Sequence, residues 1–292
     1  MIKSSKELIE DALKIFEKKS RKNRLAIVKS GFNKLDELTC GWKPGDLIII
    51  AGRPGMGKLA FASSMIKNIA IDFEQAVAFF SLEMSAHNHI TSMIASETGI
   101  SFGRLELGKL ESNDWERLNK KLDNLSNAPI YIDDTPSLSI SDLSMKASRL
   151  VLEKDVKIIV IDYLQLMTIE KSFELSRKEE IEAITRSLKN LAKELNIPII
   201  TLSQLSSTVE TRVGSKRPIL SDLSEYAEIE QNTDIVCFMY RPEYYGFDEW
   251  DDKDGTPCEG QAELIVAKHR NGGLNNIRLK FSGHLGQFSD LE

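Results

Sequence analysis

One short segment constrains this chain more than any other, a glycine-rich loop between an apolar strand and a helix. The apolar run 47–50 leads into Gly52-Arg53-Pro54-Gly55-Met56-Gly57-Lys58, after which a helical pattern begins. Two glycines separated by four residues and followed by lysine match the phosphate-binding P-loop at every position but the last. In such a loop the backbone N–H groups and the helix N-terminus surround a polyphosphate, and the lysine adds a cation. The predicted nucleotide-binding residues are Gly52, Arg53, Pro54, Gly55, Met56, Gly57, Lys58, Leu59 and Ala60.

The last position of the loop departs from the pattern. A P-loop carries Ser or Thr after the lysine, and its hydroxyl ligates the Mg²⁺ that bridges the nucleotide phosphates. This chain has Leu59, which offers no ligand atom, and the next hydroxyl in the helix is that of Ser63, a full turn away. The leucine side chain also fills space that an ion shell would need. We therefore expect nucleotide binding to survive better than hydrolysis.

Apolar runs along the chain predict the sheet to which this loop belongs. Near-continuous apolar strands separated by helices are typical of a mainly parallel sheet with helices on both faces. Helices are predicted over Leu59–Ile71 and Lys178–Leu195. The turn signal Asn271-Gly272-Gly273 predicts that the sheet ends in an antiparallel hairpin. The predicted strands are Asp46–Ala51, Ala76–Ser81, Ile130–Ile132, Lys157–Ile161, Ile197–Leu202, Ile235–Tyr240, Ala262–Lys268 and Ile277–Phe281.

Polar side chains follow three of these strands directly. Asp162 ends the run Ile158–Ile161, and an aspartate at such a position beside a P-loop typically holds the metal's water shell. Glu83 follows the earlier strand Ala76–Ser81 and suits a general base for an attacking water. Gln204 follows a third strand, where it could sense the terminal phosphate. The alternatives are that Asp162 only caps the following turn and that Glu83 is an ordinary helix-start glutamate.

Composition limits where and how such a site would act. Lys and Arg total 38 against 44 Asp and Glu, a formal charge of −6, so a polyanion site must be a local cluster of cations. The 3 cysteines are an odd number without a CxxC pair, which favours neither a disulfide framework nor a zinc site and predicts a reducing, cytoplasmic location. No apolar run approaches a membrane span.

Two segments lie apart from the predicted sheet. Residues 1–24 place apolar side chains at helical spacing and end in a run of basic residues, which predicts an amphipathic linker helix with a basic exit. That helix is either simply solvated or an arm that docks on another subunit. Residues 25–292 then form one domain. Within it, Tyr244–Gly260 is rich in aspartate and is predicted to be a solvated acidic loop.

Five motifs together resemble the C-terminal ATPase domain of bacterial replicative DNA helicases of the DnaB family. They are, in order, Gly52–Lys58, Ser81-Leu82-Glu83-Met84, Ile161-Asp162-Tyr163-Leu164-Gln165-Leu166-Met167, Leu202-Ser203-Gln204-Leu205 and Ala267-Lys268-His269-Arg270-Asn271-Gly272. The resemblance runs from about Lys29 to the end of the chain. It implies a RecA-like core that assembles as a hexameric ring, binds ATP with Mg²⁺ between subunits and moves 5′ to 3′ on single-stranded DNA.

The resemblance also implies roles for single residues. Lys58 would contact the phosphates, Glu83 would activate water, Asp162 would hold the metal, and Gln204 would couple the nucleotide state to DNA. Lys268 and Arg270 would reach into the neighbouring subunit's site, with Arg270 as an arginine finger that neutralises transition-state charge. Without the resemblance, Lys268-His269-Arg270 is only a basic strand end before a turn.

The chain departs from the family in the loop that grips DNA. Relatives carry Arg-Glu-Ser-Gly where this chain has Ser224-Glu225-Tyr226-Ala227, and Asn-Arg where it has Ser206-Ser207. The lost arginine removes a phosphate contact, and alanine in place of glycine restricts the backbone. We expect weakened, salt-sensitive DNA binding. The predicted DNA-binding residues are Arg212, Lys216, Arg217, Ser224, Glu225 and Ala227.

Three functions follow from these observations. The first is an ATP-dependent DNA helicase motor, and the second is a relative or fragment that binds nucleotide but has lost hydrolysis with Leu59. The third, a strand-exchange or clock-type ATPase on the same fold, is disfavoured by the segments Asp162–Leu166 and Lys268–Arg270. The family's helicases also carry an N-terminal domain, which is expected to be missing from a chain of 292 residues, whether a fragment or a short relative. Primase or a loader would be further partners.

Overall fold

The computed structural model describes most of the chain. The described residues are 4–6, 9, 10, 13, 27–169, 175–212, 214–223, 226–251 and 255–291. The predicted linker helix over 1–24 falls largely outside these ranges, as do Ser224, Glu225 and the side chain of Ala227. None of the described helices is long and apolar enough to cross a membrane.

The described strands form one sheet in the order β3-β2-β4-β5-β1-β6-β7-β8-β9. The six strands from β3 to β6 pair in parallel, and β6 to β9 pair antiparallel. This confirms the predicted mainly parallel sheet with a C-terminal antiparallel hairpin. The strands are β1 Leu47–Gly52, β2 Val77–Ser81, β3 Ile130–Asp133, β4 Ile158–Asp162, β5 Ile199–Gln204, β6 Ile235–Tyr240, β7 Gln261–His269, β8 Asn275–Ser282 and β9 Gln287–Asp290.

Each predicted strand is present with bounds within two residues of those expected. The edge strand β9 was missed, because Gln287-Phe288-Ser289-Asp290 contains a single apolar residue and so carries no periodic signal. The predicted helix over Leu59–Ile71 is α3, Lys58–Lys67, which continues as a π-helical segment over Asn68–Asp72. The predicted helix over Lys178–Leu195 is α8, Arg177–Leu195.

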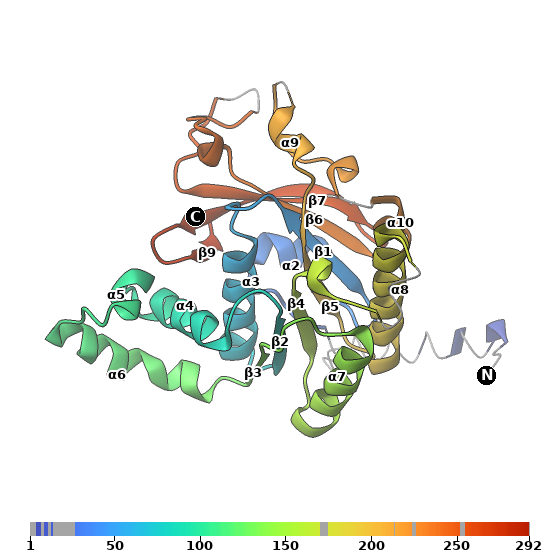
Figure 1. Ribbon diagram of the computed structural model, residues 1–292, viewed down its shortest axis with the longest axis horizontal. Coiled ribbons are helices and arrows are strands. Elements are labelled where there is room, and N and C mark those ends of the chain that lie inside the picture. The colour runs from blue at the N-terminus through green and yellow to red at the C-terminus, as the bar shows by residue number, and fades with distance from the viewer. Residues whose placement is uncertain are drawn as a thin grey trace.

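Helices cover both faces of the sheet (Figure 1). Along β1 the side chains alternate between two buried clusters. Leu47 and Ile49 belong to the cluster that includes side chains of α7 and α8, and Ile48 and Ile50 belong to the one that includes side chains of α3. This alternation explains why the strand is apolar at every position. The remaining α-helices are α2 Asn33–Thr39, α4 Ala86–Thr98, α5 Phe102–Glu106, α6 Ser112–Asn127, α7 Ile140–Lys154, α9 Thr208–Thr211 and α10 Tyr226–Asn232.

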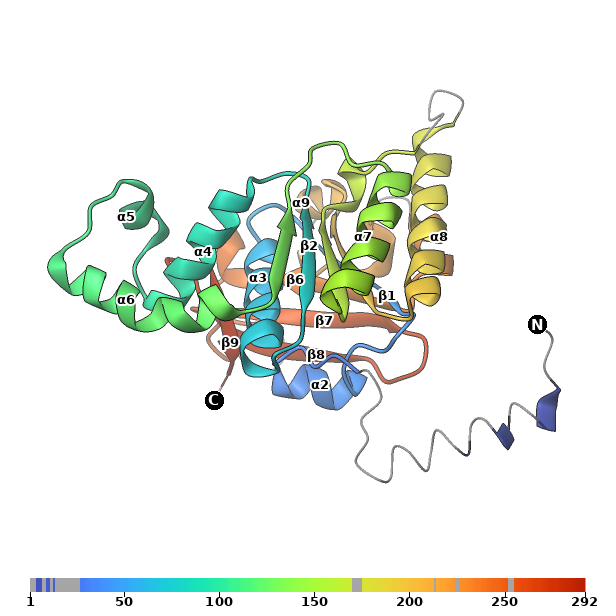
Figure 2. The same ribbon diagram turned by 90° about the horizontal axis from the view of Figure 1, so that it is seen from below.

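Helices α5 and α6 extend away from the sheet as an arm (Figure 2). Short 3₁₀ turns occupy several connections, including Leu164–Leu166 after β4 and Pro242–Tyr245 after β6.

The acidic segment after β6 is more structured than the predicted solvated loop. Trp250 and Cys258 within it are buried, and Glu249 pairs with Pro257 in an isolated antiparallel bridge. The backbone N–H of Trp250 donates to the carbonyl of Thr256 at 2.9 Å. The prediction relied on the aspartates and overlooked Trp250 and Cys258, whose buried side chains hold the segment against the core.

Candidate nucleotide-binding site

The carboxyl ends of the parallel strands bring the predicted site residues to one edge of the sheet. Gly52 at the end of β1 is in register with Gln204 at the end of β5. Ser81 at the end of β2 is in register with Asp162 at the end of β4, and the N–H of Leu82 donates to the Asp162 carbonyl at 2.7 Å. Since β2, β4, β5 and β1 are successive neighbours, the residues that follow them form one continuous row.

Two glycines give the P-loop its turn. Gly55 has φ +79° and Gly57 has φ +88°, the left-handed region that a side chain strains. A Cβ on Gly55 would also lie 2.5 Å from a ring carbon of Tyr244. Gly57 is the N-cap of α3, so the unpaired N–H groups of the first helical turn face the loop. The loop therefore has the cradle shape that a polyphosphate needs.

Lys58 is held inside this cradle by backbone carbonyls. Its Nζ donates to the carbonyl of Gly52 at 2.8 Å and to that of Arg53 at 3.2 Å. Burial lowers the pKa of Lys58 to about 8, and the negative charges of Asp162 and Glu83 partly oppose that shift. The ammonium thus faces two carboxylates and has partners that phosphate oxygens can replace.

Asp162 is the residue best suited to a cation. Asp162 is 4% exposed. Among the described side chains, its Oδ2 is one of the few buried polar atoms without a hydrogen-bond partner. Burial and the nearby Glu83 raise the pKa of Asp162 to about 6, while Lys58 lowers it. A buried carboxylate oxygen without a donor fits a hydrated Mg²⁺. Within the described ranges no cluster of three or more His, Cys, Asp or Glu side chains could hold a metal alone, so the ion would depend on nucleotide oxygens.

Leu59 does not fit the same ion. The side chain is half-buried and packs against the apolar cluster that includes the α3 side chains. Ser63 is 6% exposed within α3, and Ser64 is engaged with the Ala60 carbonyl and the N–H of Phe288. The helix therefore presents the apolar side chains of Leu59 and Ala60 directly after Lys58, where other P-loops present a hydroxyl.

The turn that carries Glu83 is fixed by a serine. The Ser81 hydroxyl donates to the Met84 carbonyl at 2.5 Å and accepts from the Met84 N–H at 3.2 Å. The buried His89 Nε2 lies 2.7 Å from the same hydroxyl oxygen, within hydrogen-bond distance. Glu83 itself is exposed. The turn thus presents a solvent-facing carboxylate from a rigid base.

Two glutamines join the ends of β4 and β5. Gln165 Nε2 donates to the Ser203 hydroxyl at 2.9 Å, and its Oε1 accepts the Gln204 N–H at 3.4 Å. Gln165 stood in a quoted motif without a predicted role. Its position three residues after Asp162 was the available signal.

Arg241 was missed by the sequence analysis altogether. Its Nη1 donates to the Gly55 carbonyl at 3.0 Å, and its guanidinium carbon lies 4.1 Å from the Phe281 ring centroid. Arg241 directly follows β6, which is parallel to β1, so the strand-end rule that identified Asp162 would also have identified it.

Lys268 and Arg270 lie at the opposite edge of the sheet. Val236 and Ile235, at the start of β6, are in register with Lys268 and His269 of β7, whereas the P-loop follows the far end of β1. Arg270 pairs with Asp234 at 2.8 Å and donates to the Gln231 carbonyl at 3.1 Å. Lys268 donates to the Glu230 carbonyl, and burial lowers its pKa. The sheet keeps both cations away from the P-loop of the same chain.

The cations predicted to meet DNA are engaged within the chain. Arg212 pairs with the buried Asp222, and Arg217 pairs with the buried Glu263 and with Asp251 at 3.1 Å. Lys216 donates to the Glu210 carbonyl at 2.9 Å. A DNA phosphate would have to compete with these partners or share them.

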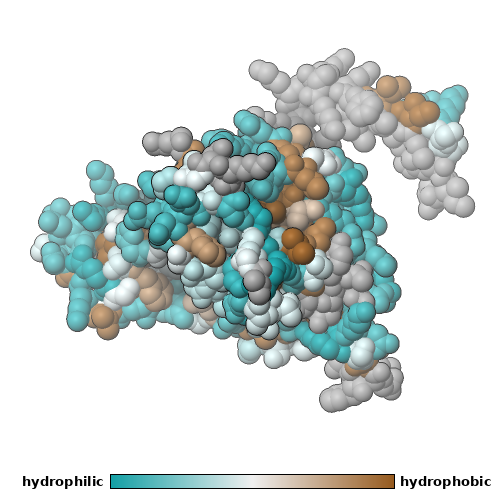
Figure 3. All heavy atoms as spheres, turned by 90° about the horizontal axis from the view of Figure 1, so that it is seen from above, coloured by the Kyte–Doolittle hydropathy of each residue, from teal (hydrophilic) through white to brown (hydrophobic). Residues whose placement is uncertain are grey.

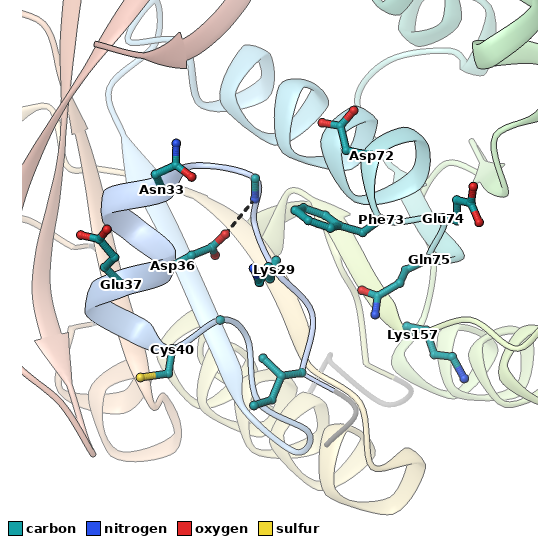
Figure 4. Close-up of a pocket in the computed structure, with 13 residues that line it drawn as sticks. Lys29, Asn33, Asp36, Glu37, Cys40, Asp72, Phe73, Glu74, Gln75 and Lys157 are labelled. Carbon is teal, nitrogen blue, oxygen red and sulfur yellow. Dashed lines mark hydrogen bonds between the residues drawn. The ribbon is translucent and has the colours of Figure 1, made fainter. Parts of the chain in front are cut away.

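The surface seen from the side of α9 is mainly hydrophilic, with its apolar residues in separate patches (Figure 3). A hollow lies elsewhere, between α2 with the segment before it and the residues that precede β2 and β4 (Figure 4). Lys29, Asp36, Glu74, Gln75 and Lys157 line it, and none of them is a predicted site residue.

The burial of Asp162 predicts a pH dependence of stability. Its folded pKa of about 6 lies above the ordinary 3.8, so the fold favours the protonated form, and that stabilisation is lost as the pH rises through 6. We expect the free energy of unfolding in EDTA to fall by on the order of 2 kcal/mol between pH 4 and pH 7 on this account. Asp162→Asn removes the titrating carboxyl group and with it this part of the pH dependence. The variant should therefore have the larger free energy of unfolding at pH 7, measured by denaturant titration. Identical pH profiles for the two chains would contradict it.

The known proteins that this chain resembles agree on one kind of domain. The family model for the DnaB-like helicase C-terminal domain matches residues 27–290. The replicative DNA helicase DnaB of Geobacillus stearothermophilus is 43% identical over 273 residues, which cover 94% of this chain and 58% of the relative. The chain spans about three fifths of the length of the curated relatives it matches.

Two solved structures have the same fold. The first, an ATPase domain, matches with a TM-score of 0.87 at 34% identity, and the match covers 98% of this chain and 99% of that one. A DnaB-like replicative helicase, described together with its interactions with primase, matches with a TM-score of 0.84 at 35% identity. That match covers 97% of this chain and 66% of the other.

Proposed function

The chain belongs to the family of DnaB-like helicase C-terminal domains, with the RecA-like fold that its motifs predicted, and we propose that it is the ATP-driven motor of a ring-shaped DNA helicase. The proposed ring is a hexamer that moves 5′ to 3′ on single-stranded DNA. The observation that supports it best is the separation of two half-sites, with Lys58 at one edge of the sheet and Arg270 at the other.

This separation argues for assembly. β1 has 6 residues, and at about 3.3 Å per residue it spans about 20 Å between the two edges. Arg270 therefore cannot neutralise charge on a nucleotide bound to its own Lys58. A head-to-tail contact would bring Arg270 and Lys268 of one subunit to the P-loop of the next, and such contacts form a ring when the rotation between subunits closes.

The described residues supply the other roles in hydrolysis. Lys58 would exchange its carbonyl partners for phosphate oxygens, and Glu83, held by its rigid turn, would accept a proton from the attacking water. Asp162 would hold Mg²⁺, which when bound neutralises charge on the phosphates. Gln204, joined to Gln165, is in a position to report the nucleotide state to the segment that follows β5.

That segment is the proposed contact with DNA. Arg212, Lys216 and Arg217 supply the cations, and Ser224, Glu225 and Ala227 complete the proposed set although they lie beyond the described side chains. Because the two arginines already pair with carboxylates, we expect weak binding that depends on salt. Primase or a loader remains a proposed partner, supported by the likeness to a helicase described with primase. The cytoplasmic location stays a prediction.

A second function is favoured by Leu59. This apolar side chain offers Mg²⁺ no hydroxyl ligand. The chain could therefore bind nucleotide and join a ring without hydrolysing the nucleotide. Both functions require nucleotide binding and differ in hydrolysis.

Binding measurements test what the two functions share. We expect a fluorescent ATP analogue with Mg²⁺ to bind the purified chain, and Lys58→Ala to weaken it at least tenfold because the variant loses a charge-assisted contact. Anisotropy of a labelled oligo(dT) should rise with protein and fall steeply with added salt. A chain that binds neither ligand, or an analogue affinity indifferent to Lys58→Ala, would contradict the proposed function.

A further inference from the structure

Arg53 connects the P-loop to the segment that follows β5. Its side chain is only 12% exposed, although it belongs to a surface loop. The guanidinium Nη1 donates to the Leu205 carbonyl at 2.8 Å, and Nε donates to Glu210 Oε1 at 2.9 Å. A single side chain thus holds two points of another loop, one on its backbone and one on a side chain of α9.

The loop that Arg53 holds is closed at its base. Leu205 pairs with Leu223 in an isolated antiparallel bridge, and the Ser206 N–H donates to the Asp222 carbonyl at 2.9 Å. Segment 205–223 therefore leaves the sheet edge and returns to the same place. Arg212, Lys216 and Arg217 lie on it, and Lys216 Nζ donates to the Glu210 carbonyl at 2.9 Å. The residue that Arg53 grips is itself a partner of one of these cations.

The other end of the connection is the phosphate-binding lysine. Lys58 Nζ donates to the Arg53 carbonyl at 3.2 Å. A bound phosphate would draw this ammonium away, because a charged oxygen is a stronger acceptor than a peptide carbonyl. Lys58 would therefore exchange its observed partners, which include the backbone of Arg53, for phosphate oxygens when nucleotide binds. Continuous contacts alone do not establish coupling, whereas a group with two discrete arrangements provides a physical basis for it.

We propose that Arg53 is a positioning residue that, through Glu210, links occupancy of the P-loop to the arrangement of segment 205–223. Nucleotide and single-stranded DNA then bind with linked affinities. This inference rests on the proposed function. The contact between Gln165 and Gln204 connects to this segment at the end of β5. The contact between Arg53 and Glu210 is a second connection and meets the segment at α9.

The linkage is measured without hydrolysis. The affinity of a fluorescein-labelled oligo(dT) is determined with and without Mg²⁺ and a non-hydrolysable ATP analogue, and the ratio of the two dissociation constants is the coupling factor. For the unmodified chain we expect a factor of about ten, within the ordinary range for linked sites. The same factor must be obtained from the analogue's affinity with and without oligo(dT), because linkage is reciprocal.

Three variants separate the linkage from a merely structural role. Glu210→Gln should lower the factor from about ten to about three, the part left to the connection through Gln165 and Gln204, while keeping the analogue's affinity without DNA. Arg53→Lys keeps the positive charge but loses the guanidinium and its several N–H donors, so it should lower the coupling factor by the same amount. The double variant should have the same coupling factor as either single variant, because both changes remove one contact. Glu182→Gln is the matched control, because it removes an exposed ion pair with Arg186 on α8 and should leave the factor unchanged.

The outcomes distinguish the two proposals. A factor that stays near its unmodified value in Glu210→Gln and Arg53→Lys would overturn the inference and leave the proposed function intact. Loss of oligo(dT) affinity by the same amount in both nucleotide states would also overturn it, since that is the signature of a purely structural ion pair. An unmodified chain that binds no oligo(dT) in either state would overturn the proposed function, and the inference with it.

Discussion

Leu59→Thr is expected to raise the steady-state rate of ATP hydrolysis by about two orders of magnitude or more. The threonine hydroxyl restores an oxygen ligand beside Lys58, and metal stabilisation of transition-state charge amounts to several kcal/mol, with about 1.4 kcal/mol for each tenfold in rate. Oδ2 of Asp162, which is buried without a hydrogen-bond partner, would be a second protein oxygen near the ion. The measurement is phosphate release by the purified chain, with and without single-stranded DNA.

Leu59→Val is the matched control. Valine has nearly the shape of threonine and lacks only the hydroxyl, so it relieves crowding by the leucine without adding a ligand. Turnover that rises with threonine and stays low with valine locates the defect in metal ligation. An unmodified chain that already hydrolyses ATP at an ordinary rate, about 1–100 per second, would refute the argument from the missing hydroxyl. Equal rescue by both residues would make it a steric defect.

The second large effect concerns Arg270. In the Leu59→Thr background, Arg270→Ala should lower turnover by about 10³-fold, the usual scale for an arginine finger. Lys58→Ala should be equally inactive for a different reason, because it lacks the phosphate contact. Mixing the two inactive chains should restore activity, since an intact Lys58 on one subunit can then meet an intact Arg270 on its neighbour.

Light scattering on the same mixture checks the assembly. The mass in the presence of nucleotide should be that of a hexamer, and the recovered activity should rise with the fraction of mixed contacts. A chain that stays monomeric with excess nucleotide would contradict the ring. Arg270→Ala with full activity as a monomer would contradict action on a neighbouring site.

Much of the site was predictable because strand ends in parallel sheets converge. The runs before Gly52, Glu83 and Asp162 are apolar at nearly every position, which identified buried parallel strands and hence their shared edge. The fold class followed from the same runs. The short edge strand β9 could not be found, because all its residues except Phe288 are polar and its pairing depends on β8.

The contacts that complete the site are long-range and have no local signal. Arg53 and Glu210 are separated by 157 positions, and nothing near either residue indicates the other. In the same way the sequence predicted Arg212 and Arg217 as DNA-binding cations without indicating their ion pairs with Asp222 and Glu263, which lie in other elements. The sequence shows which side chains of a segment are charged. Which residues form ion pairs with them depends on the fold.

Because Lys58 and Arg270 lie at opposite edges of the sheet, the activity of a ring would depend in a particular way on its fraction of impaired subunits. In a ring built as proposed, each subunit contributes half of two sites, so one subunit that cannot complete its halves silences its own site and its neighbour's. Activity would fall faster than the fraction of impaired subunits. Leu59 impairs only the P-loop half, because Arg270 of the same chain can still complete the site of its neighbour, so a chain with Leu59 in a mixed ring would silence one site and not two.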